Sequence, residues 1–254
     1  MARPFLIVPL YMYPLPTAWE PLLAAARTHP EVRFVAIVNP NSGPGPDALP
    51  DASYLAALDA MHAIPNICAV GYVYCSYGKR PAADVRGDID RYARWNQHHG
   101  ITLGGIFFDE MPSDLAHLAY MAGLAEHVKT TWRQETTGRG DGLVIYNPGV
   151  VVPRPFFAHP DYVVVFEQSH RHWDQDAAGQ QRLRLAADEV RCKTAAVVHS
   201  SRVQGGQVRD LTRGLLACGL AGIYVTDEQD GGYTQWPAVW TELTAAVAAE
   251  CSES

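Results

Sequence analysis

The chain has 254 residues, of which 48% are hydrophobic and 19% are charged, so it can bury a sizeable core and does not resemble a disordered chain. The formal net charge of −7 argues against non-specific binding to nucleic acid or to an anionic membrane, because both attract a basic surface. No apolar stretch is long enough to span a membrane, so we expect no membrane segment.

The cysteines and the start of the chain bear on the cellular compartment. The cysteines are Cys68, Cys75, Cys192, Cys218 and Cys251. Their number is odd and they lack the C-x-x-C spacing of metal sites, so they are predicted to be buried free thiols. The apolar run at residues 5–8 is too short for the core of a signal peptide. We therefore expect a cytoplasmic protein from the chain as given, or a secreted one if a leader has been removed.

The first half of the chain alternates apolar runs typical of strands with amphipathic or capped runs typical of helices. Strands are predicted at residues 5–13, 32–38, 67–74 and 101–108, and helices at residues 51–64, 82–98 and 115–132, with a further helix capped by Thr17. Residues 39–46 are rich in proline and glycine, and residues 134–141 are polar, so both segments are predicted to be turns or loops.

The second half continues the alternation. Strands are predicted at residues 143–146, 162–166, 194–198 and 222–225, and helices at residues 179–191, 208–218 and 236–249. The connection at residues 151–161 is too rich in proline for a full helix. Eight strands separated almost everywhere by helices predict a single α/β domain over residues 1–254, a (β/α)8 barrel of the TIM type, with the last few residues disordered.

An open, doubly wound sheet is the alternative fold. Such a sheet normally carries a glycine-rich phosphate turn after its first strand. The sequence Tyr11-Met12-Tyr13-Pro14 at that place is not such a turn, so the closed barrel is favoured.

Two adjacent carboxylates, Asp109 and Glu110, follow the apolar run at residues 101–108. No basic residue lies within several positions of them, and unpaired acids at a strand end are costly unless they serve chemistry or find a distant partner. The alternative is that they only stabilise the start of a following helix. The other strand ends favour a role in chemistry, because they carry polar residues too.

In a barrel of this type, the active face is formed by the carboxyl ends of the strands and the loops that follow them. The polar and aromatic residues predicted there are Tyr11, Tyr13, Asn39, Tyr74, Tyr77, Arg80, Asn147, Glu167, His199 and Asp227. Aromatic rings pack on the C–H faces of sugars, and amides and carboxylates bind hydroxyl groups, so this ring is predicted to bind a sugar or polyol. Taken singly, the tyrosines could instead pack at the rim, His199 could be a core histidine, and Asn147 could belong to a turn.

Other chemistries find less support in the sequence. The nearest approach to metal-ligand spacing is His170-Arg171-His172, which we interpret as solvated loop histidines, so no metal is expected. No lysine lies at a strand end, which argues against a Schiff base. The loop at residues 39–46 lacks the Gly-Lys-Ser/Thr ending of a phosphate loop. No cofactor is expected.

Several of these segments form a characteristic series. They are Pro9-Leu10-Tyr11-Met12-Tyr13-Pro14, Asn39-Pro40-Asn41-Ser42-Gly43-Pro44-Gly45, Gly71-Tyr72-Val73-Tyr74, Ser76-Tyr77-Gly78 with Arg80, Gly105-Ile106-Phe107-Phe108-Asp109-Glu110, Asn147-Pro148-Gly149 and Phe166-Glu167. In this order they resemble the successive motifs of the spherulin-4 (spherulation-specific family 4) proteins. The resemblance extends from the first predicted strand to the sixth.

The resemblance implies a glycoside hydrolase. Members of the family include the glycoside hydrolases of family 135, which are (β/α)8 barrels that cut microbial exopolysaccharide rich in α-1,4-linked galactosamine and N-acetylgalactosamine, and related barrels act on similar biofilm polymers. It therefore implies an endo-acting enzyme, with Asp109, Glu110 and Glu167 at the acidic positions of the family. Family members are often secreted or membrane-anchored.

Cleavage of a glycosidic bond needs two carboxyl groups, and we predict that Asp109 and Glu167 are the working pair. Glu167 follows an apolar run and is the candidate proton donor, while Asp109 is predicted to act as nucleophile or to stabilise the charged transition state. Glu110 is expected to position the substrate or Asp109. A non-catalytic carbohydrate-binding barrel is the alternative. The sequence leaves open the linkage and acetylation preference, retention or inversion, which of Asp109 and Glu110 is the primary catalytic acid residue, and the oligomeric state.

Overall fold

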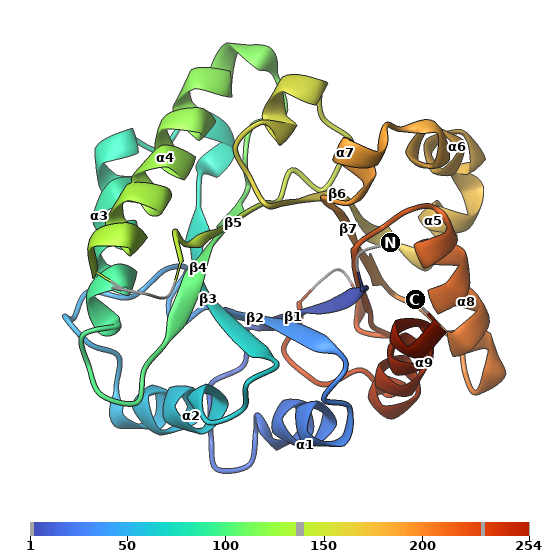
Figure 1. The fold of residues 1–254 in the computed structure, drawn as a ribbon, viewed down its shortest axis with the longest axis horizontal. Helices are drawn as coiled ribbons and strands as arrows, with labels where there is room; N and C mark the ends of the chain where they lie inside the picture. The colour runs from blue at the N-terminus through green and yellow to red at the C-terminus, as the bar shows by residue number, and fades with distance from the viewer. Residues whose placement is uncertain (1–2, 136–139, 230–231, 254) are drawn as a thin grey trace.

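The computed structural model describes residues 3–135, 140–229 and 232–253. Its parallel strands form a closed barrel in the order β1 to β8, with helices around the outside (Figure 1). The strands are β1 (Phe5–Leu10), β2 (Arg33–Val38), β3 (Ile67–Tyr74), β4 (Leu103–Asp109), β5 (Leu143–Tyr146), β6 (Tyr162–Ser169), β7 (Thr194–His199) and β8 (Gly222–Val225). The predicted (β/α)8 barrel is confirmed.

Helices occupy most of the connections between strands. They are α1 (Glu20–Thr28), α2 (Ala52–His62), α3 (Ala82–Trp95), α4 (Leu118–Glu135), α5 (His170–Gln175), α6 (Ala177–Leu185), α7 (Asp188–Arg191), α8 (Gly206–Ala217) and α9 (Trp240–Glu253), with 3-10 turns η1 (Ser76–Gly78), η2 (Leu115–His117) and η3 (Arg154–Phe157). The β5–β6 connection contains η3 and no α-helix, as its prolines predicted. Asp51 caps α2, because its carboxylate accepts hydrogen bonds from the backbone nitrogens of Ser53 and Tyr54.

The barrel strands are buried on both faces, which explains their continuous apolar sequences. Large aromatic residues of α3 and α4 fasten the helical layer to the strands. The Trp132 indole donates to the carbonyl of Leu103 at 2.9 Å, and the Tyr92 hydroxyl donates to the carbonyl of Val38 at 3.1 Å. Each ring therefore buries apolar surface while its polar atom keeps a partner.

A short seam between β1 and β8 closes the barrel. Phe5 lies opposite Gly222 and Leu6 opposite Ile223 in the parallel register. A Cβ atom at Gly222 would lie 2.3 Å from Phe5 Cζ. The Phe5 ring also contacts Tyr162, with 4.5 Å between ring centroids, so it has little freedom to move away. The seam therefore depends on the small size of Gly222.

The structure corrects several predicted boundaries. The first strand ends at Leu10, earlier than predicted, and Thr17 lies in a left-handed turn with φ 69° rather than at a helix cap. The sixth strand continues to Ser169, because the polar residues after Phe166 extend the ladder instead of starting a loop. The helix predicted at residues 179–191 is divided into α6 and α7, and the preceding α5 was not predicted.

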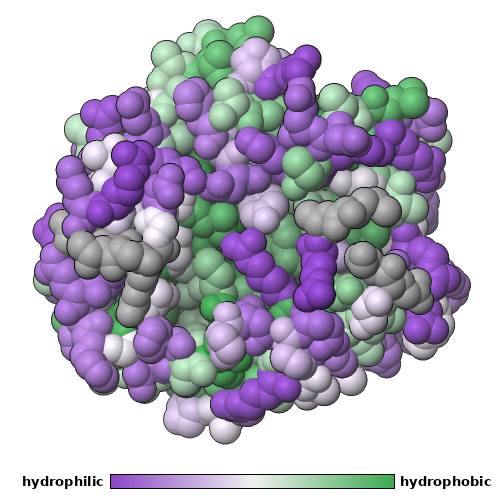
Figure 2. Space-filling model, in the orientation of Figure 1, coloured by the Kyte–Doolittle hydropathy of each residue, from purple (hydrophilic) through white to green (hydrophobic). Residues whose placement is uncertain are grey.

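On the face of the molecule shown in Figure 2, hydrophilic residues predominate around the periphery. Within the described residues, no helix is long and apolar enough to cross a membrane. Disorder was predicted for the last few residues; α9 continues to Glu253, and Ser254 lies outside the described residues. Residues 136–139 of the predicted polar turn also lie outside them.

The seam provides a test of the fold. We expect Gly222→Ala to lower the free energy of unfolding by about 1–3 kcal/mol, because the added methyl group overpacks the core against Phe5. Gly214→Ala is the control, since nothing lies within 4 Å of a Cβ at that position of α8. The control should gain up to about 1 kcal/mol from its better helix propensity. Urea unfolding measures both, and unchanged stability of Gly222→Ala would contradict the described seam.

Candidate active site

Asp109, the last residue of β4, is held by groups from both neighbouring strands. The Tyr72 hydroxyl of β3 donates to Oδ2 at 2.7 Å, and Asn147 Nδ2, just after β5, donates to Oδ1 at 2.8 Å. Side chains alternate along a strand, so Asp109 shares its side of the sheet with Phe107, whose ring stacks on Tyr72. Both carboxylate oxygens are thereby fixed in orientation.

Asn147 lies between Asp109 and Glu167 and is only 5% exposed. Its backbone nitrogen donates to the carbonyl of Phe108 at 2.8 Å, which fixes it beside the end of β4. Its side-chain nitrogen donates to Asp109 Oδ1 at 2.8 Å and also to Glu167 Oε2 at 2.6 Å. One amide group thus joins two carboxylates that would otherwise repel each other.

The bridging orientation leaves the side-chain oxygen of Asn147, Oδ1, buried, and this oxygen has no hydrogen-bond partner among the described residues. Turning the amide over would point an acceptor at two carboxylates and remove both bridging bonds. Leaving this oxygen unpaired therefore costs less free energy than turning the amide over would.

Glu167 lies in β6, beyond a register shift between Val164 and Phe166. Its Oε1 accepts a hydrogen bond from the Tyr233 hydroxyl at 2.7 Å, and its Oε2 accepts one from Asn147. Burial raises the pKa of Glu167 above its usual value, and the nearby charge of Asp109 raises it further, while the two hydrogen bonds act in the opposite direction. The net direction is upward, so Glu167 holds its proton more tightly than an exposed glutamate.

Tyr11 completes a cluster of tyrosines above the two acids. Its ring meets Tyr72 and Tyr233 edge to face, with centroid distances of 5.4 and 5.6 Å. Burial raises the pKa of the Tyr11 phenol well above its usual value, and the charges of Asp109 and Glu167 add to the rise. Tyr11 is therefore a neutral hydroxyl beside both carboxylates, able to donate to a bound hydroxyl group.

Glu110 lies at a sharp turn of the chain after β4. Its φ is 47°, and Ser76 and Tyr77, in the adjoining loop after β3, have φ of 47° and 53°. The two loops are joined by a hydrogen bond of 2.6 Å from the backbone nitrogen of Tyr77 to the carbonyl of Glu110. Left-handed backbone at non-glycine residues is strained and tends to cluster at functional sites. Within the described residues, the Glu110 carboxylate has no hydrogen-bond or ion-pair partner, and the Tyr77 ring is 61% exposed.

Other residues predicted at the strand ends have partners outside the acid pair. The Tyr13 hydroxyl donates to Asp51, and the Asn39 side chain accepts from the backbone nitrogen of Gly43. Arg80 forms an ion pair with Asp88, and its guanidinium group lies over the Tyr74 ring. His199 contacts the Ser200 hydroxyl, and the Asp227 carboxylate accepts from the backbone nitrogen of Ala238. These interactions order the rim loops. The structure thus brings Tyr11, Asn147 and Glu167 to Asp109, whereas Tyr13, Asn39, Tyr74, Arg80, His199 and Asp227 interact with the surrounding loops.

Two residues that contact the acids were not predicted. Tyr72 lies inside β3, two residues before the strand end, and its place in an apolar run indicated a core residue. The alternation of side chains along β3 and β4 was the signal available for it. Tyr233 lies in the β8–α9 connection, in a segment without periodicity, so no sequence pattern indicated it.

No group of three or more His, Cys, Asp or Glu side chains that could hold a metal ion occurs in the described part of the chain. His170, the first residue of the segment considered above, contacts Ser201 at 3.3 Å and Asp174 at 3.5 Å. Its two ring nitrogens are thereby occupied within the protein.

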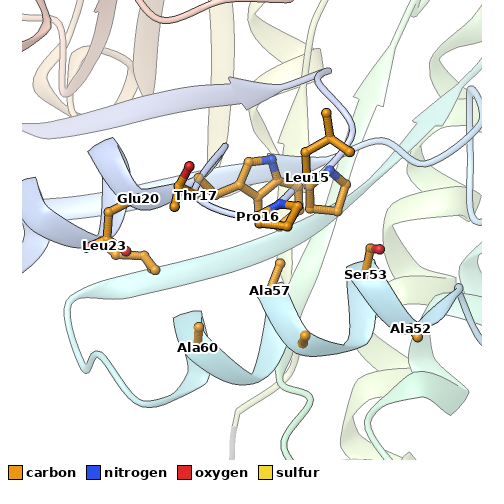
Figure 3. Close-up of a pocket in the computed structure, with 12 residues that line it drawn as sticks. Leu15, Pro16, Thr17, Glu20, Leu23, Ala52, Ser53, Ala57 and Ala60 are labelled. Carbon is orange, nitrogen blue, oxygen red and sulfur yellow. The ribbon is translucent and has the colours of Figure 1, made fainter.

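Apolar grooves also lie away from the acid pair in the described part of the chain. One, of about 400 Å³, separates the β1–α1 connection from α2, and Figure 3 shows Leu15 and Pro16 on one side of it and Ala57 on the other. Another, of about 290 Å³, lies between the η3 connection and α6. Neither is lined by the acids, so the candidate chemistry belongs to the barrel mouth.

With this geometry established, comparison with known proteins gives the family. The profile of spherulation-specific family 4 matches residues 5–247. The chain belongs to this family. Spherulin-4 of Physarum polycephalum is 32% identical over 254 residues, which cover 97% of this chain and 69% of that protein. The predicted resemblance is confirmed, and it extends beyond β6 to the last helix.

Solved structures agree with the spherulation-specific family 4 assignment. Aspergillus clavatus Sph3, crystallised in complex with GalNAc, superposes with a TM-score of 0.86 at 32% identity, covering 97% of this chain and 98% of that one. The hyperthermostable endo-1,4-beta-D-mannanase of Thermotoga petrophila superposes with a TM-score of 0.61 at 10% identity over 100% of both chains. At that identity the mannanase shows the shared barrel fold alone.

The raised pKa of Glu167 leads to a pH-dependent stability. A group whose pKa is higher in the folded state contributes stability that is fully present below its unfolded pKa and is lost as pH rises through the folded pKa. Glu167→Gln cannot ionise. We therefore expect its free energy of unfolding, relative to wild type, to increase as pH rises above the usual glutamate pKa of about 4.3.

Urea unfolding at several pH values measures this trend. Glu126→Gln, at an exposed position of α4, is the matched control and should show no such increase. A stability difference between Glu167→Gln and wild type that stays constant with pH would contradict the described environment of Glu167.

Proposed function

We propose that this protein is an endo-acting glycoside hydrolase. It cleaves internal glycosidic bonds of an exopolysaccharide that contains α-1,4-linked galactosamine and N-acetylgalactosamine. The observation that carries the proposal is the pair of carboxylates, Asp109 and Glu167, held by one amide nitrogen at the end of the barrel strands. Two such carboxyl groups are what hydrolysis of a glycosidic bond requires. Membership of the family and the GalNAc complex of Sph3 support an amino-sugar substrate.

In the proposed mechanism Glu167 is the general acid. Burial and the charge of Asp109 raise its pKa, which favours a protonated carboxyl group that can give its proton to the leaving glycosidic oxygen. Asp109, oriented by Tyr72 and Asn147, attacks the anomeric carbon. In the second step Glu167, now ionised, takes a proton from the water that displaces Asp109.

The Asn147 bridge favours retention of configuration. The two oxygens that share its nitrogen can be no further apart than the sum of the two bonds, 2.8 and 2.6 Å. Inverting enzymes separate their carboxyl groups by about 6.5–9.5 Å to admit a water, whereas retaining enzymes place them about 5–5.5 Å apart. This upper limit lies within the range of retaining enzymes and below that of inverting ones.

Three further residues are proposed to contact the substrate. The exposed Tyr77 ring offers an apolar face to the C–H surface of a sugar. The Tyr11 hydroxyl can donate to a sugar hydroxyl beside the acids. The unpartnered carboxylate of Glu110 can accept from a hydroxyl, an amide or an ammonium group of the sugar. The residues predicted to bind substrate but engaged in the loops are proposed to shape the rim of the site; they are Tyr13, Asn39, Tyr74, Arg80, His199 and Asp227.

Substitution of the acids tests the proposed reaction. We expect Asp109→Asn and Glu167→Gln to fold normally, because neither changes side-chain volume, and to lose at least about 100-fold in rate, the usual scale for a missing acid or base. Glu110→Gln should show a smaller loss. The measurement is the release of reducing ends from a polymer of α-1,4-linked galactosamine and N-acetylgalactosamine.

Glu126→Gln, far from the barrel mouth on α4, serves as the control for the preparation. Near-normal cleavage of the polymer by Glu167→Gln would contradict the assignment of Glu167 as the general acid. Binding of the polymer by wild type without any release of reducing ends would instead support a carbohydrate-binding barrel.

The stereochemical outcome is a separate test. We expect the product released first to have the same anomeric configuration as the bond that was cut, because Asp109 and Glu167 are joined too closely for an intervening water. NMR of the newly formed anomeric proton, recorded before mutarotation, measures this. An inverted first product would mean that the carboxylates separate in the substrate complex and that Asp109 is not the nucleophile.

A further inference from the structure

Tyr233 reaches Glu167 from a connection that contains neither strand nor helix at that point. Its hydroxyl donates to Glu167 Oε1 at 2.7 Å. Its ring is 3% exposed and meets Tyr11 and Tyr224 edge to face, with centroid distances of 5.6 and 6.2 Å. The ring is thus confined on two sides and its hydroxyl is aimed at one carboxylate oxygen.

The backbone at Tyr233 is strained, with φ 50°. Such a conformation persists in a residue with a side chain only where the surroundings enforce it. Glu228 supplies this constraint, because its carboxylate accepts hydrogen bonds from the backbone nitrogen of Thr234 at 3.0 and 2.8 Å and from the Thr234 hydroxyl at 2.6 Å. Glu228 is itself tied to β7, since its carbonyl accepts from the backbone nitrogen of Ser200 at 2.9 Å.

We infer that Tyr233 is a positioning residue for Glu167, and that Glu228 keeps it in place through Thr234. Asn147 fixes one oxygen of Glu167 and Tyr233 fixes the other, so together they allow the carboxyl group a single orientation. Neither Tyr233 nor Glu228 belongs to the acidic or strand-end residues of the motifs described above. The inference deepens the proposed function, on which it rests for the role of Glu167, but the contact itself does not depend on it.

A hydroxyl group suits this position for a chemical reason. The amide nitrogen of Asn147 can only donate, whereas the Tyr233 hydroxyl donates to an ionised carboxylate and rotates to accept from a protonated one. Tyr233 therefore keeps its contact in both protonation states of Glu167. Such a partner can keep the carboxyl group oriented while Glu167 acts first as acid and then as base in the proposed reaction.

The contact also sets the acidity of Glu167. Burial and the charge of Asp109 raise the pKa of Glu167, and the hydrogen bond from Tyr233 opposes them. Removing the hydroxyl should therefore raise the pKa of Glu167 further, by about one pH unit for the loss of one hydrogen bond to a charged group.

The experiment is a pH titration of the Glu167 carboxyl carbon by NMR in the full chain labelled with ¹³C at glutamate side chains. Glu167→Gln identifies the signal by its absence. We compare wild type with Tyr233→Phe, which keeps the confined ring, and with Glu228→Ala, which frees the turn. Tyr162→Phe is the matched control, because Tyr162 starts the same strand and its hydroxyl accepts from Arg33 at 3.1 Å, away from the acids.

We expect the pKa of Glu167 to rise by about one pH unit in Tyr233→Phe, to rise in the same direction in Glu228→Ala, and to stay unchanged in Tyr162→Phe. If Tyr233→Phe does not fold, the pKa of Glu167 in Glu228→Ala tests the inference instead. An unchanged pKa in both variants, or an equal rise in the control, would overturn the inference. These readings need no substrate, so they stand even if the protein hydrolyses no polymer.

Activity provides the second readout. In Tyr233→Phe we expect kcat to fall by about tenfold or more with little change in KM, because a displaced carboxyl group affects the chemical step. The alkaline limb of the pH profile should move to higher pH, since the acid loses its proton later. A fall in kcat with an unmoved pH profile would show a merely structural role and would overturn the inference. Absence of hydrolysis in wild type would reject the proposed function alone.

Discussion

Two carboxylates share one amide nitrogen, and the arrangement of the whole barrel mouth depends on that sharing. Asp109 at the end of β4 and Glu167 in β6 would repel each other if both were ionised in a partly buried place. Asn147, directly after the strand between them, donates one N–H to each. The order of strands in a closed barrel makes this possible, because β5 lies between β4 and β6. The buried, unpaired oxygen of Asn147 is the price of the bridge.

A shell of tyrosines surrounds this bridge and gives the acids different environments. Tyr72 donates to Asp109, Tyr233 donates to Glu167, and Tyr11 lies against both rings. The hydroxyls stay neutral because burial and the nearby carboxylates raise their pKa values. Neutral donors leave the negative charge of the pair in place, which a lysine or arginine would cancel. This charge is what stabilises a developing positive charge on a sugar ring.

Much of the fold could be predicted from the sequence because each strand is marked by a local sequence pattern. The strands at Ile67–Tyr74, Leu143–Tyr146 and Gly222–Val225 have the predicted bounds, since each is a short apolar run between turn residues or helix ends. Asp109 and Glu167 were also predictable, because parallel strands in a barrel deliver their ends to one face. The β6 boundary was wrong because Glu167 and Gln168 looked like the start of a loop while they still pair with β7.

Contacts made across the chain could not be predicted in the same way. Arg80 carries a charge at a strand end, yet its partner, Asp88, lies on α3 and draws it into the loop structure. Tyr233, whose own backbone is strained and whose neighbour Thr234 is bound by Glu228, contacts Glu167, which is distant in sequence. Periodicity describes single elements, and it carries no information on which side chains of two loops will meet.

The measurement that tests the account most directly is hydrolysis of the α-1,4-linked galactosamine and N-acetylgalactosamine polymer by Asn147→Ala. The variant keeps both carboxylates and removes the side-chain carboxamide whose nitrogen joins them. If the bridge organises the site, the rate should fall by at least about 100-fold, as for a misplaced catalytic group, while circular dichroism still shows the folded barrel. Cleavage at nearly the wild-type rate by the folded variant would contradict the central role of the shared amide.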